Sequence, residues 1–319
     1  MPKVLGWYLN AKTREQKSIK AAIDLLRKDL DVIFIDIFQE LPPPNQFDAI
    51  FHKPTLEWNS EDSTIQEKAH HFVSFLRDNP SIIQIDPVDS VLMFTNRLCI
   101  DEKLSSFSIT FNDSDNIWTV QSPCSLHLLG SLEMALADLQ EMHPPLPCYV
   151  KPSKSCGPRE THQLSICSTL EQLLACLHSH PTQEFLVQEC ISHLPIVHKA
   201  YTVLGECIFS RKAGSVPHPT SDTQYDFDSQ KKFSIDGAVE QEESSLNPIP
   251  QALFAEIASA ISRLTGVQLF GFDVIRKSDD PHRLYVIDIN YLPSFSGMDE
   301  APEAIRRNIL KRMGIEISS

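Results

Sequence analysis

Two carboxylates and one amide recur at short spacing near the end of the chain. Asp288 and Asn290 stand two residues apart in an apolar run, and Asp273 stands in the apolar run before it. The polar segment 277–283 between the two runs predicts an antiparallel hairpin. Because side chains alternate faces along a strand, Asp288 and Asn290 should point the same way. Three oxygen-bearing side chains on one face could bind a Mg²⁺ ion that also binds phosphate oxygens. The alternative is that these side chains cap strand ends or pair with nearby Lys and Arg.

Two lysines in apolar surroundings could supply the matching positive charge. Lys151 ends an apolar run just before Pro152, and Lys199 starts another predicted strand. The strand between them runs into a connector, 188–191, of the kind that can offer backbone groups to the edge of a purine. The alternative for a lysine at a strand end is that its stem packs on the protein while its ammonium reaches water. The chain thus presents a lysine, a connector, a second lysine and the carboxylates in that order.

The composition excludes several common classes of protein. A net charge of −14 over 319 residues argues against a general nucleic-acid binder. Neither a Walker loop nor a dinucleotide-binding glycine motif occurs, and the cysteines and histidines show no zinc-like spacing. No apolar run approaches the roughly 20 residues that span a bilayer, and the N-terminal apolar stretch is too short for a signal peptide. We therefore expect a cytoplasmic protein with reduced thiols and no nucleic-acid or membrane partner.

The first hundred residues alternate between strand and helix patterns. This alternation predicts a parallel sheet with helices on its faces. Strands are expected at 3–9, 31–37, 47–52 and 82–85, and helices at 15–28, 63–78 and 89–104. The polar segment that follows, 105–126, is expected to be irregular.

The rest of the chain contains the elements that must position the lysines and the carboxylates. Helices are expected at 132–141, 169–178, 251–264 and 301–313. Strands are expected at 147–151 and 184–191, and a hairpin is expected from 197–204 and 207–211. The segment 212–249 has weak periodicity, and we interpret it as a long functional loop.

The ordered set of motifs resembles the ATP-grasp fold. Within that fold it is similar to the inositol tetrakisphosphate 1-kinase family, also called the inositol 1,3,4-trisphosphate 5/6-kinases. The matching positions are 6–9, 50–53, 151–157, 162–164, 187–188, Ile191, His193, Lys199, 266–273 and 286–293. The resemblance implies an α/β protein with a parallel-sheet N-terminal domain and two α+β subdomains that clamp ATP. The implied ranges are 1–96 for the N-terminal domain, 97–205 for the central subdomain and 206–319 for the C-terminal subdomain with the magnesium hairpin.

The resemblance also implies roles for individual residues. The nucleotide would be bound by Arg97, Lys151, Gln188, Glu189, Cys190, Ile191, Lys199, Ser215, Ser229 and Ser234. The inositol phosphate would be bound by Lys12, His162, Lys199, Arg211, Asn290 and Ser294. Two Mg²⁺ ions would be held by Asp273, Asp288 and Asn290. Within this set the catalytic residues would be Lys151, Lys199 and Asp288.

Three departures from the family pattern fall on the substrate side. The family usually has a lysine where this chain has Thr13, so Lys12 or Arg14 would have to supply that contact. The glycine loop at 156–162 is one residue longer than the family pattern, and begins with cysteine where the family has histidine. A family arginine aligns on Ala213 unless a gap moves it to 211 or 212. ATP binding is therefore better supported than the identity of the substrate.

These features predict a monomeric, ATP- and Mg²⁺-dependent kinase. It would phosphorylate a free hydroxyl, at the 1-, 5- or 6-position, of an inositol tris- or tetrakisphosphate. One alternative is an ATP-grasp carboxylate–amine ligase, although those enzymes commonly carry Glu where this chain has Asp288. Another is a non-catalytic descendant that binds inositol phosphates or nucleotide. The intact set of metal-binding positions argues against a non-catalytic protein.

Overall fold

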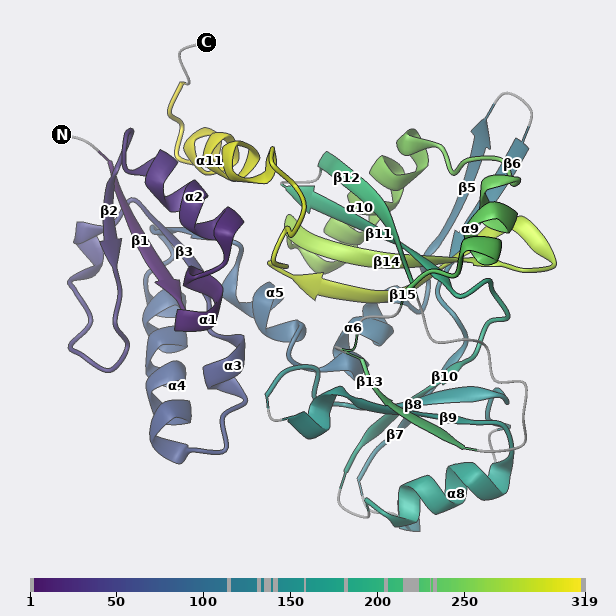
Figure 1. Ribbon diagram of the computed structural model, residues 1–319. Coiled ribbons are helices and arrows are strands. Elements are labelled where there is room, and N and C mark those ends of the chain that lie inside the picture. The colour runs from purple at the N-terminus through teal and green to yellow at the C-terminus, as the bar shows by residue number, and fades with distance from the viewer. Residues whose placement is uncertain are drawn as a thin grey trace.

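The described residues of the computed structural model form three β-sheets with helices packed against them (Figure 1). It describes residues 3–113, 116–130, 133–134, 139, 143–157, 159–180, 183–203, 206–214, 224–229, 231 and 234–316, with residues 11, 159 and 206–211 described by their backbone alone. Within these ranges no helix is long and apolar enough to cross a membrane.

The N-terminal sheet has four parallel strands in the order β2-β1-β3-β4. The strands are β1 (Val4–Leu9), β2 (Asp31–Phe34), β3 (Ala49–Lys53) and β4 (Ile83–Ile85). The helices around it are α1 (Ala11–Arg14), α2 (Lys17–Leu26), α3 (Thr55–Trp58), α4 (Ser63–Asp78) and α5 (Val88–Met93), with a short 3-10 turn η1 (Pro44–Gln46). Alternate residues of β1 and β3 join one core with α2 and another with α4, so helices cover both faces as predicted.

The predicted helix at 89–104 is interrupted. It consists of α5 and α6 (Arg97–Leu104), and the side chain of Asn96 caps α6 by accepting the N–H of Leu98. This break matters for the site, because it places Arg97 in the first turn of α6.

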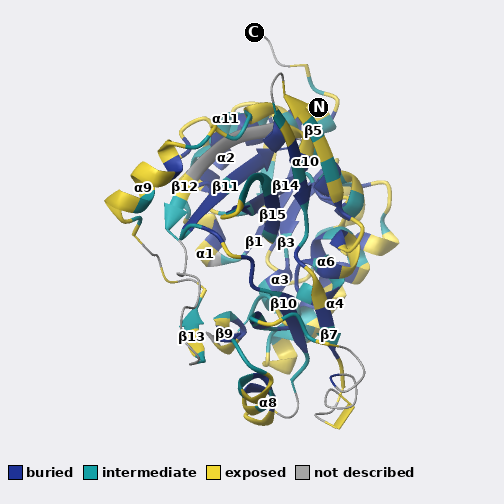
Figure 2. Ribbon diagram, turned by 90° about the vertical axis from the view of Figure 1, so that its right-hand side faces the viewer, coloured by how far each residue is buried: buried dark blue, intermediate teal, exposed yellow. Residues whose placement is uncertain are grey.

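The central sheet is antiparallel, with strand order β13-β9-β8-β10-β7. Its strands are β7 (Ser125–Leu128), β8 (Cys148–Pro152), β9 (Gln163–Cys167), β10 (Phe185–Glu189) and β13 (Tyr225–Asp228). The 3-10 turn η2 (Arg159–His162) lies in the connection between β8 and β9. Helix α8 (Leu170–His178) is capped by Thr169 and packs an apolar face against the sheet. Exposed residues gather on the outer turns of α8 and of α9 (Gly237–Ser244) (Figure 2).

The third sheet has six strands in the order β12-β11-β14-β15-β6-β5. They are β5 (Ser108–Asp113), β6 (Asn116–Gln121), β11 (Ile196–Val203), β12 (Glu206–Gly214), β14 (Leu269–Lys277) and β15 (Asp280–Tyr291). Only β6 and β15 pair in parallel within this sheet as described. Helix α10 (Gln251–Thr265) joins the core of this sheet, α9 is Gly237–Ser244, and α11 (Ala301–Arg312) lies against α2.

Two predictions about irregular segments are wrong. The segment 105–126 forms β5, β6 and the start of β7, because apolar side chains such as Trp118 and Val120 alternate with polar ones and fall on the buried face, whereas Ile117 is exposed. The segment 212–249 contains β13 and α9, and the carboxylate of Asp236 caps α9 by accepting the N–H of Ala238.

The sheets do not follow contiguous stretches of the chain. Strands β5, β6 and β11 lie within 97–205 but belong to the sheet of the C-terminal hairpin, whereas β13 lies within 206–319 and belongs to the central sheet. Strand pairing therefore crosses the predicted domain boundary at 205. The division of the chain at 96 and 205 remains a prediction.

Candidate active site

The hairpin formed by β14 and β15 brings the predicted metal-binding residues together. In the strand register Lys199 on β11 lies opposite Asp273 on β14, and Asp273 lies opposite Asp288 on β15. Directly opposite residues of an antiparallel pair point to the same face, so the three charges form one row across three strands. Asn290 extends the row along β15, where its side-chain Nδ2 donates to Oδ2 of Asp288 at 2.7 Å.

Opposite charge stabilises this row, in which Lys199 and Asp273 are half-buried and Asp288 is exposed. The ammonium of Lys199 donates to Oδ2 of Asp273. Burial acts to lower the pKa of Lys199, but the charge and hydrogen bond of Asp273, together with the charge of Asp288, outweigh it and leave that pKa above its ordinary value. Lys199 is therefore a permanent cation beside two carboxylates.

Lys151 approaches the same row from the central sheet. It lies on β8, and its Nζ donates to Oε1 of Gln188 at 2.6 Å and to the carbonyl oxygen of Ile287 at 3.3 Å. The second contact bridges the central sheet to β15, one residue before Asp288. Burial lowers the pKa of Lys151 to about 8, while the charge of Asp288 acts in the opposite direction. A nearby anion would therefore hold the proton on this lysine.

Arg97 anchors the connection between β8 and β9. Its guanidinium donates to the carbonyl oxygens of Pro152 at 2.7 Å, Lys154 at 2.6 Å and Thr161 at 3.1 Å. A guanidinium carries five N–H groups, so these bonds leave two for an anion. Burial lowers the pKa of Arg97, and Asp288 acts in the opposite direction. Arg97 thus both holds the loop that leads to His162 and faces the charged row.

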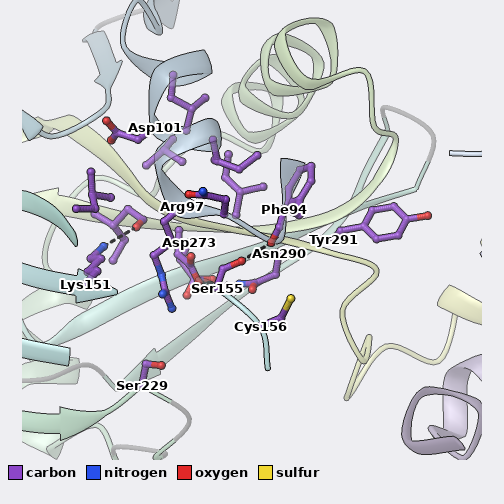
Figure 3. Close-up of a pocket in the computed structure, with 18 of the residues that line it drawn as sticks. Phe94, Arg97, Asp101, Lys151, Ser155, Cys156, Ser229, Asp273, Asn290 and Tyr291 are labelled. Carbon is purple, nitrogen blue, oxygen red and sulfur yellow. Dashed lines mark hydrogen bonds between the residues drawn. The ribbon is translucent and has the colours of Figure 1, made fainter. Parts of the chain in front are cut away.

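These charges line two adjoining cavities of about 320 and 560 Å³. Figure 3 shows Arg97, Lys151, Asp273 and Asn290 gathered there, with Ser229 on one side. Both cavities are lined by Arg97, Lys151, Gln188, Lys199, Ser229, Asp273, Ile287 and Asp288. We call the smaller the N-side cavity, because it reaches the N-terminal sheet, and the larger the connector cavity.

The connector cavity has the character of a base-binding site. Its apolar lining comes from both sheets and includes Tyr149, Leu164, Ile191, Val197, Phe227, Ile275 and Ile287. Gln188 and Glu189 line it as well. Cys190 is buried and is not among the lining residues, and its N–H donates to the carbonyl oxygen of Pro147 at 2.9 Å. The N–H of Glu189 donates to the carbonyl oxygen of Cys124 at 2.8 Å. These two N–H groups are therefore already engaged within the protein.

The N-side cavity contains part of the predicted substrate set. His162 and Asn290 line it. Burial lowers the pKa of His162, and Arg97 lowers it further, so the imidazole is held toward its neutral form. Lys12 does not line either cavity, but its charge lowers the pKa values of Lys53 and His162, which places its ammonium toward this end.

Two further predicted residues lie away from the cavities. Ser234 and Ser294 are exposed and do not line either one. Ser215 lies outside the described residues. Arg211 is described by its backbone alone, which pairs opposite Lys199 at the end of the charged row.

The structure distinguishes between the two cations that flank Thr13. Thr13 is buried, and its N–H donates to Oδ1 of Asn10 at 2.9 Å. The guanidinium of Arg14 lies 5.9 Å from the ring centre of Phe34, away from the cavities. Of the two residues expected to replace the family lysine, Lys12 is therefore the one whose charge reaches the site.

Lys53 is a site residue that sequence reasoning did not select. It ends β3, lines the N-side cavity, and its Nζ donates to the carbonyl oxygens of Tyr291 at 2.9 Å and Leu292 at 3.0 Å. Burial lowers its pKa to about 8. The available signal was its place at the carboxyl end of a parallel strand, where α/β sheets bind their ligands.

Asp101 and Cys156 also line the N-side cavity without having been selected. Asp101, four residues after Arg97 on α6, accepts from Ser125 Oγ at 2.5 Å and lies 2.8 Å from His127 Nε2. The thiol of Cys156 donates to the carbonyl oxygen of Thr55 at 3.2 Å, and burial raises its pKa. Cys156 is therefore a neutral group where the family has a histidine.

The residues of the hairpin fit a magnesium ion that shares its ligands with phosphate. Among the described residues, no three His, Cys, Asp or Glu side chains form a complete metal site. The predicted set has two carboxylates and one amide, and Asn290 uses its N–H on Asp288, which leaves its oxygen for a ligand bond. Mg²⁺ typically takes one or two carboxylates and completes its shell with water and substrate phosphates. The donor set is thus suitable for Mg²⁺ bound with a nucleotide.

Known proteins match the chain along most of its length. A family model described as the inositol 1,3,4-trisphosphate 5/6-kinase ATP-grasp domain matches residues 115–310. The chain is 25% identical over 311 residues to inositol-tetrakisphosphate 1-kinase 3 of Arabidopsis thaliana, covering 93% of this chain and 81% of the relative. It is 24% identical over 326 residues to inositol-tetrakisphosphate 1-kinase 6 of Oryza sativa subsp. indica, covering 95% of this chain and 58% of that longer relative.

Solved structures show the same architecture. The D-cycloserine synthetase DcsG aligns with a TM-score of 0.60 over 97% of this chain and 99% of its own, at 13% identity, which shows a common fold alone. The predicted ATP-grasp fold is therefore confirmed. Since the family model covers more than half of the sequence, the chain belongs to the inositol 1,3,4-trisphosphate 5/6-kinase ATP-grasp family.

Proposed function

We propose that this protein is a kinase that transfers the γ-phosphoryl group of ATP, with Mg²⁺, to a free hydroxyl of an inositol tris- or tetrakisphosphate. The observation that carries the proposal is the charged row formed by Lys199, Asp273 and Asp288. It lies between a cavity with apolar walls suited to a purine and a second cavity that Lys53 of the N-terminal sheet also lines. Membership of the family supports the substrate class, because both relatives described above are named as inositol-tetrakisphosphate kinases.

Phosphoryl transfer requires charge neutralisation, in-line placement of the acceptor and exclusion of water more than covalent chemistry by the protein. Lys151, Lys199 and the free N–H groups of Arg97 would balance the charge of the triphosphate. Mg²⁺, held by Asp273, Asp288 and Asn290, would neutralise the charge that develops as the phosphoryl group moves. The bond from the γ-phosphorus to the bridging oxygen breaks and ADP leaves, while a new bond forms to the acceptor oxygen, whose hydroxyl proton is released to solvent.

The N-side cavity would hold the inositol phosphate. Lys53, Lys12 and His162 come from three different segments and would contact its phosphates from the side opposite the hairpin. Asn290 lies where both ligands would meet. Because Thr13 and Cys156 are neutral where the family carries lysine and histidine, this cavity holds fewer cations, which favours a substrate with fewer phosphates.

The test is to incubate the protein with ATP, Mg²⁺ and a panel of inositol tris- and tetrakisphosphates, and to resolve the product isomers by chromatography. We expect a product with one added phosphate for at least one member. Asp279→Asn, an exposed carboxylate at the turn of the same hairpin, is the matched control and should leave turnover unchanged. No product from any member of the panel would refute the proposed activity.

A further inference from the structure

A buried polar cluster lies behind the N-side cavity, where the N-terminal sheet meets the hairpin. Asp86, at the end of β4, is fully buried. Its Oδ2 accepts the N–H groups of Gln268 at 2.9 Å and Leu269 at 3.1 Å, and its Oδ1 accepts from Arg312 Nη1 at 2.6 Å. A buried carboxylate is costly unless it is fully hydrogen-bonded, so these donors must stay in place for Asp86 to remain ionised. The cluster thereby joins β4, the start of β14 and the end of α11.

Tyr291 joins the other strand of the hairpin to the same point. Its buried hydroxyl lies 3.2 Å from the carbonyl oxygen of His52 and 3.3 Å from that of Ile85, and it accepts the N–H of Asp86 at 3.2 Å. Tyr291 directly follows Asn290, and its own carbonyl oxygen accepts from Lys53.

The two links fix the hairpin at both of its inner ends. Asp86 holds β14 four residues before Asp273, and Tyr291 holds β15 one residue after Asn290. The N-terminal part contributes Lys53 of β3 and Thr55 of α3 to the lining of the N-side cavity, whereas the hairpin contributes the oxygen ligands. The width of this cavity therefore depends on how the two parts are joined.

We infer that Asp86, Arg312 and Tyr291 are positioning residues that set the distance between Lys53 and the oxygen ligands of β15, and thereby determine the binding of the inositol phosphate. This inference rests on the proposed function. It predicts a selective effect, because neither Asp86, Arg312 nor Tyr291 lines the connector cavity. Tyr291 does line the N-side cavity, but its hydroxyl is directed to carbonyl oxygens of the N-terminal sheet. A merely structural cluster would instead affect the binding of both ligands, or only thermal stability.

Titration calorimetry on the full chain separates these possibilities, with Mg·ATP and an inositol tetrakisphosphate as the two probes. Arg312→Gln removes a partly exposed donor, and Tyr291→Phe removes only the hydroxyl, so the second variant keeps the test valid if the first unfolds. Arg307→Gln, on an exposed face of the same helix, is the control.

We expect the dissociation constant of the inositol phosphate to rise at least tenfold in both variants. That of Mg·ATP should stay within twofold, and Arg312→Lys should recover part of the loss. Unchanged inositol phosphate binding in folded variants, or equal weakening of both ligands, would overturn the inference while leaving the proposed function intact. Failure of the unaltered protein to bind the inositol phosphate would overturn the proposed function, and the inference with it.

Discussion

Replacing Lys53 with methionine tests the assignment of the N-side cavity to the inositol phosphate. The change removes the ammonium and keeps most of the apolar stem. A charge-assisted hydrogen bond to phosphate contributes about 1.5–3 kcal/mol. Since about 1.4 kcal/mol is a tenfold change in affinity, we expect inositol phosphate binding to weaken about ten- to a hundredfold. Binding of Mg·ATP should change by less than about threefold, because Lys53 does not line the connector cavity.

The effect of Lys53→Met on stability should be small, because two contributions oppose each other. Burial lowers the pKa of Lys53 from 10.5 to about 8, and at about 1.36 kcal/mol per unit the charged form is disfavoured by roughly 3 kcal/mol at most. Methionine removes this penalty but also removes the donor to the carbonyl oxygens of Tyr291 and Leu292, at about 1.5–3 kcal/mol each. We expect the free energy of unfolding to change by no more than about 3 kcal/mol.

The assay is titration calorimetry with each ligand, accompanied by denaturant unfolding. Lys20→Met is the control, because Lys20 is an exposed lysine on α2 of the same domain. An inositol phosphate affinity equal to that of the unaltered protein would show that the substrate phosphates bind elsewhere. An equal loss for both ligands would show that Lys53 supports the whole site rather than one half.

Four further predictions concern the charged residues of the site. Asp288→Ala should abolish turnover while the protein remains folded, because the carboxylate holds the ion that stabilises the transition state; near-normal steady-state rates would contradict the assignment of the hairpin. Lys151→Ala should chiefly raise the KM for ATP and His162→Ala that for the inositol phosphate, so matching kinetic profiles would argue against separate roles. Binding of both ligands, measured by calorimetry from pH 7 to 9.5, should weaken as pH rises through about 8, because Lys53 and Lys151 lose their protons there. In the unfolded chain these two lysines keep their protons up to about pH 10.5. The free energy of unfolding should therefore rise as pH increases from about 8 to about 10.5.

The hairpin of β14 and β15 is the part of the site that the sequence predicts best. The period of two in a strand places Asp288 and Asn290 on one face whatever the rest of the fold does, and a short polar turn makes the neighbouring strand the partner. The alternation of strands and helices likewise predicts the N-terminal parallel sheet, because each element must bury one apolar face.

Contacts between distant segments could not be predicted in this way. Lys53 reaches the site by donating to Tyr291, 238 residues further along the chain, and no local pattern encodes such a meeting. The pairing of β6 with β15 similarly depends on a parallel contact between distant segments. The local sequence pattern of 105–126 therefore predicts an irregular segment where strands form. The serines that the family resemblance implies as site residues differ in position for the same reason. Ser229 lines both cavities, whereas Ser294 is exposed and lines neither.

Transfer of a phosphoryl group to an inositol hydroxyl is tested most directly by following the phosphorus atoms of ATP. Phosphorus-31 NMR of the protein with Mg·ATP and an inositol trisphosphate or tetrakisphosphate resolves ADP, inorganic phosphate and new phosphomonoesters. The proposed kinase predicts one new inositol phosphomonoester for each ADP formed, with little inorganic phosphate. ADP accompanied by an equal amount of inorganic phosphate, appearing only when a carboxylic acid and an amine are supplied, would instead identify a ligase and contradict the account.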